Sequence, residues 1–125
     1  MGIPATILIV DDDASGRAML SLSLRQAGYR VLTASGGEEA LAALEQEDCD
    51  CLITDAKMRP MDGFELTSRA KRLRPELRIA MISAVYSEND IRTRPIDRFF
   101  PKPVPVDALL DWIAPKGTAR SGGSA

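Results

Sequence analysis

The feature that most constrains the fold is the alternation of short apolar runs with stretches of helical periodicity. The run Thr6–Val10 is continuously apolar and rich in β-branched residues, which is typical of a parallel strand buried on both faces. From Ala14 to Ala27 the apolar residues recur at helical spacing, and Gly28 supplies a stop signal. Parallel neighbours in a sheet require crossover connections, which place helices on both faces. We therefore expect a doubly wound α/β fold.

Later segments repeat this order and extend the expected sheet to five strands. The other expected strands are Tyr29–Ala34, Cys49–Thr54, Leu77–Ile82 and Arg98–Phe100. A second helix should follow Ser35-Gly36-Gly37-Glu38, which has the spacing of a capping box, and two more should cover Phe64–Leu73 and Val106–Ile113. A chain of 125 residues has the size of one compact domain.

Charge and composition exclude several classes of function. The 16 basic and 18 acidic residues give a formal charge of −2, so we expect no cationic surface for nucleic acid. No apolar run approaches the roughly 20 residues that cross a bilayer, and we expect a cytoplasmic protein without membrane contact. The chain has no histidine, which excludes Ser-His and Cys-His nucleophilic chemistry. Any chemistry must use carboxylates, hydroxyls and amines.

Polar side chains follow four of the expected strands. They are Asp11 with Asp12, then Asp55, Ser83 and Lys102. The carboxyl ends of parallel strands meet at one edge, where such sheets bind ligands. Three crowded carboxylates repel one another unless a cation offsets their charge, and Mg²⁺ (or Mn²⁺) suits oxygen ligands. A lysine and a hydroxyl would supply donors to a phosphoryl group, so the set predicts phosphoryl transfer to a carboxylate.

Five segments carry a more specific signal: Ile7–Asp13, Leu52–Asp55, Met61–Gly63, Met81–Ala84 and Lys102-Pro103. Together they resemble the CheY-like receiver domains of response regulators, over about residues 6–113. The resemblance implies a flavodoxin-like sheet and a receiver domain at 1–114. The Gly- and Ser-rich composition after Pro115 leads us to expect a flexible tail or linker remnant at 115–125. It also implies a two-component phosphorelay in which a sensor histidine kinase or a histidine phosphotransfer protein supplies the phosphoryl group.

The same resemblance implies signalling rather than turnover. Conformational change would carry the signal to an unknown downstream protein, and the domain would catalyse only its own phosphorylation and dephosphorylation. A homodimer is left open, and no contact with nucleic acid by this domain is expected.

The resemblance also implies roles for the acidic residues. Asp55 would be the phosphoacceptor. Asp12 and Asp55 would bind the metal directly, together with the backbone carbonyl of Lys57. Asp11 would bind it through water. Asp13 is expected to cap the first helix instead, because acidic side chains favour a helix N-terminus.

Ser83 and Lys102 would bind the phosphoryl oxygens, with the peptide bond between Lys102 and Pro103 in the cis form. Ser83 and Phe99 would form the switch, in which the aromatic side chain turns inward on phosphorylation. Phe99 stands where the family often has tyrosine, so we expect a switch without a hydroxyl and a partly active unphosphorylated state.

The chain departs from the family pattern at two further places. Met58-Arg59-Pro60 has one residue between the methionine and the proline, which puts the rigidity of that loop in question. The segment between Ala84 and Pro101 is short by nearly one helical turn and contains Pro95, so the helix expected there should be stunted or missing. We expect high mobility from Val85 to Pro95.

Two other functions remain open. A pseudo-receiver would bind a protein without using phosphate. The intact acidic set argues against this function, whereas the altered segment after Ser83 keeps it open. A small phosphohydrolase of the haloacid dehalogenase type also begins with a motif such as Asp11-x-Asp13 after its first strand. Such enzymes place further carboxylates after the lysine, whereas here Asp55 precedes Lys102.

Overall fold

Five parallel strands form one sheet in the order β2-β1-β3-β4-β5. The computed structural model describes residues 5–114. Its strands are β1 (Thr6–Val10), β2 (Arg30–Ala34), β3 (Cys51–Asp55), β4 (Arg78–Ser83) and β5 (Arg98–Pro101). Its helices are α1 (Ala14–Gln26), α2 (Gly37–Gln46), α3 (Gly63–Leu73), the 3₁₀ helix η1 (Glu88–Ile91) and α4 (Val106–Ile113). The predicted doubly wound α/β fold is confirmed, and the predicted tail at 115–125 lies outside the described residues.

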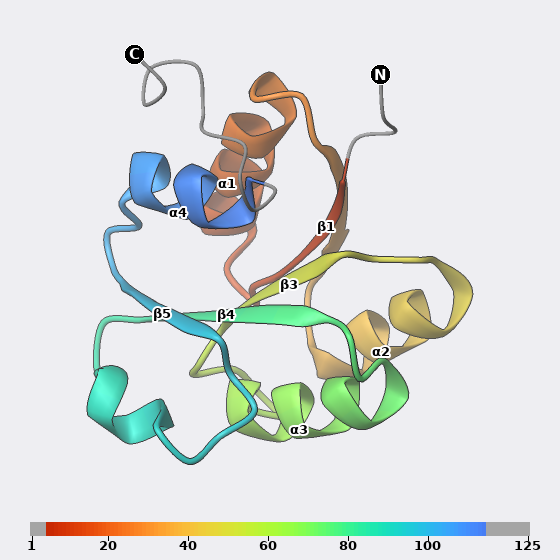
Figure 1. Ribbon diagram of the computed structural model, residues 1–125, viewed down its shortest axis with the longest axis vertical. Coiled ribbons are helices and arrows are strands. Elements are labelled where there is room, and N and C mark those ends of the chain that lie inside the picture. Colours follow the sequence, from red (N-terminus) through yellow and green to blue (C-terminus); the bar gives the residue numbers. More distant parts are fainter. Residues whose placement is uncertain (1–4, 115–125) are drawn as a thin grey trace.

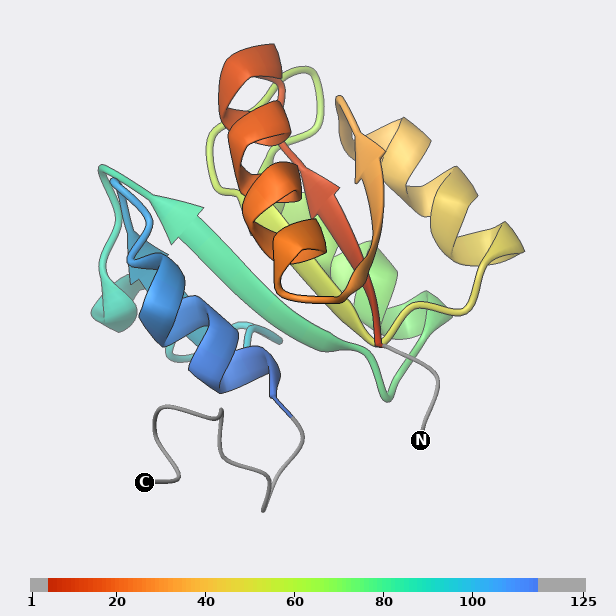
Figure 2. The same cartoon turned by 90° about the horizontal axis from the view of Figure 1, so that it is seen from above.

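Helices cover both faces of the sheet, α1 and α4 on one and α2 and α3 on the other (Figure 1; Figure 2). Successive side chains of a strand point to opposite faces. Ile7 and Ile9 therefore pack with α1 and α4, whereas Leu8 and Val10 pack with α2 and α3. All five residues of β1 are buried, as the apolar run predicted. None of the helices in residues 5–114 combines the length and the apolar character that a membrane span requires.

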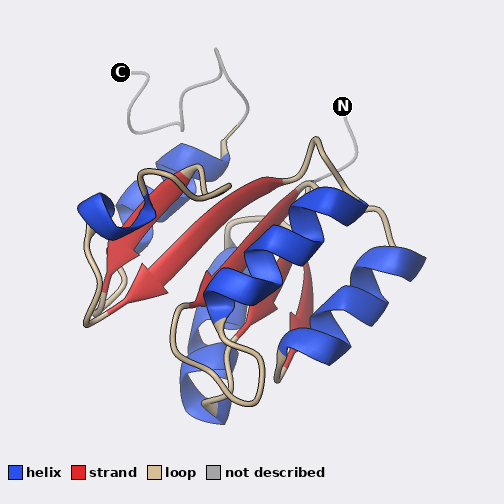
Figure 3. Cartoon of the chain, turned by 90° about the horizontal axis from the view of Figure 1, so that it is seen from below, coloured by secondary structure: helices blue, strands red, loops and turns tan. Residues whose placement is uncertain are grey.

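The carboxyl ends of the strands lie along one edge of the sheet (Figure 3). β1 and β3 are neighbours at the centre, and the chain leaves them toward opposite faces, to α1 and to α3. Two loops thus diverge at the point where the strand order reverses, which is where open α/β sheets hold their ligands.

The predicted capping box at Ser35 is wrong. α2 begins after Gly36, which makes no side-chain capping bond. The backbone N–H and the hydroxyl of Ser35 both donate to Oε1 of Glu39, at 2.8 and 2.9 Å, and not to Glu38. Because the helix starts one residue later than the motif suggests, the carboxylate that turns back toward Ser35 is four residues away.

The third strand also begins later than predicted. β3 starts at Cys51, and Cys49 precedes it. Cys49 packs against the apolar cluster on the α2 and α3 face, whereas Cys51 belongs to the cluster on the α1 and α4 face. Burial raises the pKa of the Cys51 thiol to about 11, which keeps it protonated at neutral pH.

The segment between β4 and β5 contains the four-residue helix η1 in place of a full α-helix. The predicted shortening is confirmed. Ser87 and Asp90 form a capping box at its start, with Ser87 N–H donating to Asp90 at 2.7 Å. The mobility expected from Val85 to Pro95 stays a prediction.

Gly63 lets α3 approach the end of β3, and its substitution should be costly. Its N–H donates to the carbonyl of Ala56 at 2.8 Å. A Cβ at Gly63 would clash with the carbonyl oxygen of Asp55 and lie 2.9 Å from the Cα of Ala56. Gly63→Ala should therefore lower the free energy of unfolding by about 1–3 kcal/mol or more, measured by urea denaturation. Gly36→Ala is the control, since a Cβ there meets nothing within 4 Å. Equal stability of the two variants would contradict the close packing of Gly63.

Candidate functional site

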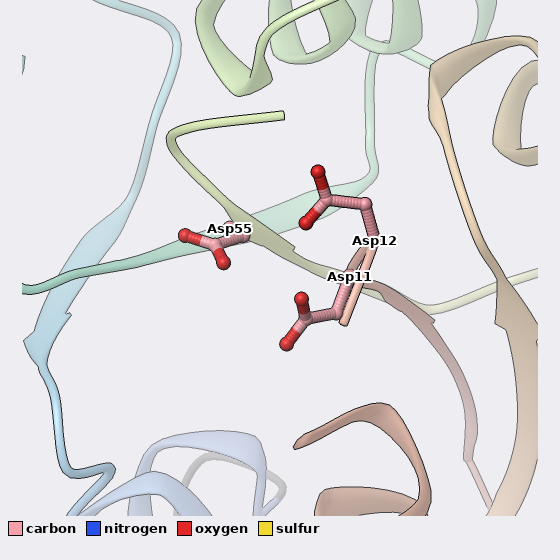
Figure 4. A group of neighbouring side chains, drawn as sticks. All are labelled: Asp11, Asp12 and Asp55. Carbon is pink, nitrogen blue, oxygen red and sulfur yellow. The ribbon is translucent and has the colours of Figure 1, made fainter. Parts of the chain in front are cut away.

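Three carboxylates meet at the centre of the carboxyl edge. Asp11 and Asp12 follow β1, and Asp55 is the last residue of β3 (Figure 4). Val10 pairs with Thr54 in the parallel register of these strands, so the residues that follow in each strand lie side by side. One oxygen from each of the three carboxylates lies within 4.8 Å of the others. Asp55 is 9% exposed and Asp12 is exposed, so the cluster opens from the sheet to the solvent.

The electrostatics of Asp11 indicate that this cluster suits a cation. Burial raises the pKa of its carboxyl above the usual value, and the charges of Asp55 and Asp12 act in the same direction. The backbone N–H of Asp13 and the charge of Lys102 offset part of this rise. Because folding raises the pKa, the ionised carboxylate destabilises the fold above that pKa, and protonation at lower pH removes the cost. A hard divalent ion with oxygen ligands would also remove it, so the donor set fits Mg²⁺.

Lys102 lies directly against the buried carboxylate. Its Nζ is 2.6 Å from Oδ2 of Asp55. Burial alone lowers the pKa of Lys102, but the hydrogen bond and charge of Asp55, with the charges of Asp11 and Asp13, raise it overall. The amine is therefore a cation at neutral pH. The backbone N–H of Lys102 donates to the carbonyl of Ser83 at 3.1 Å, and the peptide bond to Pro103 is cis, as predicted.

Ser83 is the last residue of β4 and is 2% exposed. Its Oγ accepts the backbone N–H groups of Val85 and Tyr86, each at 3.0 Å. These bonds occupy the lone pairs of the hydroxyl and leave its proton as a donor. The structure brings Ser83 to the correct edge of the sheet, beside the strand that carries Asp55.

The two remaining predicted residues lie around the same edge. Lys57 and Asp12 line a hollow of about 320 Å³, with Tyr86 on its wall. Phe99 is half-buried and packs against Met81 in a small cluster with Phe64, Tyr86 and Ile96.

Two features of the site were missed by the sequence reasoning. Nη1 of Arg17 donates to the carbonyl of Asp11 at 2.7 Å, and the hydroxyl of Thr54 donates to the carbonyl of Asp55 at 3.0 Å. The only signal for Arg17 was its place in the first turn of a helix that follows the acidic residues.

An apolar groove leads from the surface to the acidic cluster. It has a volume of about 400 Å³, and Asp55 and Lys102 are among the residues that line it. Met19 and Leu20 of α1 line it on one side, and Val104, with Val106 of α4, on the other. Met19 is 71% exposed, so an apolar residue accessible to solvent borders the site.

Residues 7–114 match the family described as the response regulator receiver domain. The transcriptional regulatory protein GlrR of Escherichia coli is 36% identical over 113 residues, which are 88% of this chain and 26% of GlrR. The autoinducer 1 sensor kinase/phosphatase LuxN of Vibrio campbellii is 33% identical over 93% of this chain and 14% of its own length. The chain thus spans 26% of the length of one relative and 14% of the other.

Solved structures of receiver domains and response regulators are also similar to this chain. A CheY-like receiver domain from Methanospirillum hungatei has a TM-score of 0.83 and 32% identity, over 89% of this chain and 91% of its own. The chemotaxis protein CheY4 of Vibrio cholerae has a TM-score of 0.82 and 31% identity, over 89% of this chain and 97% of its own. TrrA of Thermotoga maritima was solved in complex with Mg²⁺ and BeF. It has a TM-score of 0.80 and 29% identity, over 87% of this chain and 96% of its own.

Proposed function

Because this chain belongs to the response regulator receiver domain family of two-component systems, we propose that its Asp55 accepts a phosphoryl group from a phosphohistidine. The donor would be a sensor histidine kinase or a histidine phosphotransfer protein in the cytoplasm. The observation that carries the proposal is the contact of Lys102 Nζ with Asp55 Oδ2 at 2.6 Å, beside the carboxylates of Asp11 and Asp12. The chain acts as a signalling module, and its downstream target and any homodimer are left open.

The proposed transfer forms a bond between an Asp55 oxygen and phosphorus and breaks the bond between phosphorus and the imidazole nitrogen of the donor. The electron pair of the broken bond stays with the imidazole. The ammonium of Lys102 and the hydroxyl proton of Ser83 would donate to the phosphoryl oxygens.

Mg²⁺ or Mn²⁺, held by Asp12 and Asp55 directly, by Asp11 through water and by the carbonyl of Lys57, would neutralise charge on the transferred group. Three carboxylates so close together repel one another, and such a cation would offset that repulsion.

The apolar groove gives the proposed donor a place to dock. A protein that carries a phosphohistidine must reach Asp55, and the groove between α1 and the start of α4 leads to it. The exposed side chains of Met19 and Leu22 on α1 would bury apolar surface on docking.

The proposal is tested by chemical phosphorylation. Acetyl phosphate with Mg²⁺ should add one phosphoryl group to the intact protein, measured by mass spectrometry. The same reaction with EDTA is the control and should leave the protein unlabelled. No labelling at millimolar Mg²⁺ would support a pseudo-receiver, which the short helix η1 favours. Steady turnover of a phosphate ester would instead support a phosphohydrolase.

Phosphorylation should also change the segment between β4 and β5. Ser83 Oγ accepts the N–H groups of Val85 and Tyr86 in its present position, so a movement of this oxygen toward a phosphoryl group would break both bonds. Tyr86 packs edge-to-face on Phe64 with ring centroids 5.0 Å apart, and the Arg94 guanidinium lies 4.3 Å from the centre of the same ring. Loss of the two bonds should therefore weaken the packing of Tyr86 and Arg94 on the Phe64 ring.

Beryllofluoride with Mg²⁺, which mimics the phosphoryl group, provides the measurement. We expect backbone amide shifts and faster hydrogen exchange over residues 84–97, with Phe99 also affected. Ser83→Ala is the control and should abolish the change in this segment. Changes confined to the acidic pocket would mean that the domain is a phosphate sink or a relay intermediate.

A further inference from the structure

Asp11 is held by three separate hydrogen bonds. Its backbone N–H donates to the carbonyl of Ala34 at 3.2 Å, and its Oδ1 accepts the N–H of Asp13 at 2.9 Å. Its carbonyl oxygen accepts Nη1 of Arg17 at 2.7 Å. The first two bonds are local or belong to the sheet edge, whereas the third ties the end of β1 to a side chain of α1.

The bond from Arg17 acts on the peptide unit that joins the two acidic residues. The carbonyl of Asp11 and the N–H of Asp12 lie in one plane because the peptide bond is planar. Fixing that plane restricts the ψ angle of Asp11 and the φ angle of Asp12. Those two angles decide where the carboxylate of Asp12 lies relative to those of Asp11 and Asp55, and they set the path of the chain to the Asp13 N–H that the Asp11 carboxylate accepts.

The surroundings of Arg17 indicate that its role is geometric. The hydrogen bond from Arg17 goes to a main-chain oxygen and not to a carboxylate of the cluster. The charge of Arg17 also reaches Glu39, whose pKa is lowered chiefly by the hydrogen bonds from Ser35 and to a smaller extent by Arg17. Arg17 is half-buried, and its guanidinium is held at the turn that follows β1.

Gly16 supports the same interpretation. A Cβ at this position would lie 3.0 Å from Oδ2 of Asp11 and 3.0 Å from Oδ2 of Asp13. Alanine favours a helix more than glycine does, yet glycine stands inside α1 at this point. The first turn of α1 therefore leaves room for the carboxylates of Asp11 and Asp13.

We propose that Arg17 is a positioning residue for the metal site, and that it orients Asp11 and Asp12 toward Asp55 before the cation binds. The inference rests on the proposed function. A site whose ligands are already oriented loses less conformational freedom on binding, so the loss of such support weakens metal binding.

The test compares two arginines of α1 that each donate to a backbone carbonyl. Arg17→Gln removes the bond to Asp11, and Arg25→Gln removes a 3.3 Å bond from Nη2 to the carbonyl of Val31, at the other end of the helix. Mg²⁺ binding is measured by calorimetry, without a phosphodonor. Arg17→Gln should raise the dissociation constant about tenfold, and Arg25→Gln should leave it unchanged.

The direction of the change in Mg²⁺ affinity in Arg17→Gln distinguishes a positioning role of Arg17 from an effect of its positive charge. Loss of a positive charge near three carboxylates would by itself strengthen the binding of a cation. Arg17→Lys keeps the charge but lacks the planar guanidinium, so it too should bind Mg²⁺ more weakly than the parent.

Parent-like or tighter binding by Arg17→Gln would overturn the positioning role alone. Failure of the parent protein to bind Mg²⁺ would overturn both this inference and the proposed function. If Arg17→Gln does not fold, Arg17→Lys provides the second test, because it keeps the charge and the aliphatic stem of the side chain but lacks the planar guanidinium.

Discussion

Asp55→Asn is expected to abolish covalent phosphorylation by acetyl phosphate, while the domain stays folded. Asparagine has nearly the shape of aspartate, and its carbonyl oxygen can still accept the hydrogen bond from Lys102. Its neutral amide cannot form the acyl phosphate, however, and it also removes one of the three oxygens proposed to hold the cation. The measurement is the mass of the intact protein after reaction with Mg²⁺, and the labelled fraction should fall from nearly complete to none.

Asp48→Asn is the matched control. Asp48 is exposed and precedes the amino end of β3, whereas Asp55 lies at the carboxyl end of the same strand. The control variant should be labelled at the parental rate. If Asp55→Asn takes up a phosphoryl group as readily as the parent, Asp55 is not the acceptor. Fragmentation of the labelled protein would then show whether Asp11 or Asp12 carries the group instead.

The parts of the fold that the sequence predicted well are those that burial dictates. Thr6–Val10 and Val106–Ile113 were predicted with the bounds that β1 and α4 have. A strand covered on both faces must be apolar throughout, and a helix on one face must be apolar along one stripe, so both leave a strong pattern. The polar residues at the strand ends followed from the parallel topology, which gathers them at one edge.

The predictions that failed concern local contacts with several alternatives of similar free energy. Ser35 could bond Glu38 or Glu39, and the register of α2 decided for Glu39. Cys49 was assigned to a strand that begins only at Cys51, because strand ends depend on pairing with neighbours and not on composition.

The supporting contacts of the site were the least predictable part. The bond from Arg17 to Asp11 depends on the angle at which α1 leaves β1. The bonds from Val85 and Tyr86 to Ser83 likewise depend on the path of the chain after β4. The loops after β1 and β4 have no periodic pattern of residues in the sequence. These contacts therefore cannot be predicted from residue type or spacing.

The two acidic residues after β1 should differ in their effect on metal binding, although they are neighbours. Asp12 is exposed, and its carboxylate forms no hydrogen bond or ion pair with the residues that the structure describes. The carboxylate of Asp11 is half-buried, and its Oδ1 already accepts the N–H of Asp13. Asp12 therefore has both oxygens available to a cation, as expected of a direct ligand, and Asp11 suits a contact through water.

Asp12→Ala is accordingly expected to abolish phosphorylation at millimolar Mg²⁺, and Asp11→Ala to reduce it. Thermal unfolding with and without Mg²⁺ gives a second readout, since a ligand at 100 times its dissociation constant stabilises the native state by about 2.7 kcal/mol. That stabilisation should vanish in Asp12→Ala and persist in part in Asp11→Ala. Without Mg²⁺, Asp12→Ala should unfold at a higher temperature than the parent, because one of three mutually repelling carboxylates is gone. Equal losses in the two variants would mean that both residues bind the cation in the same way.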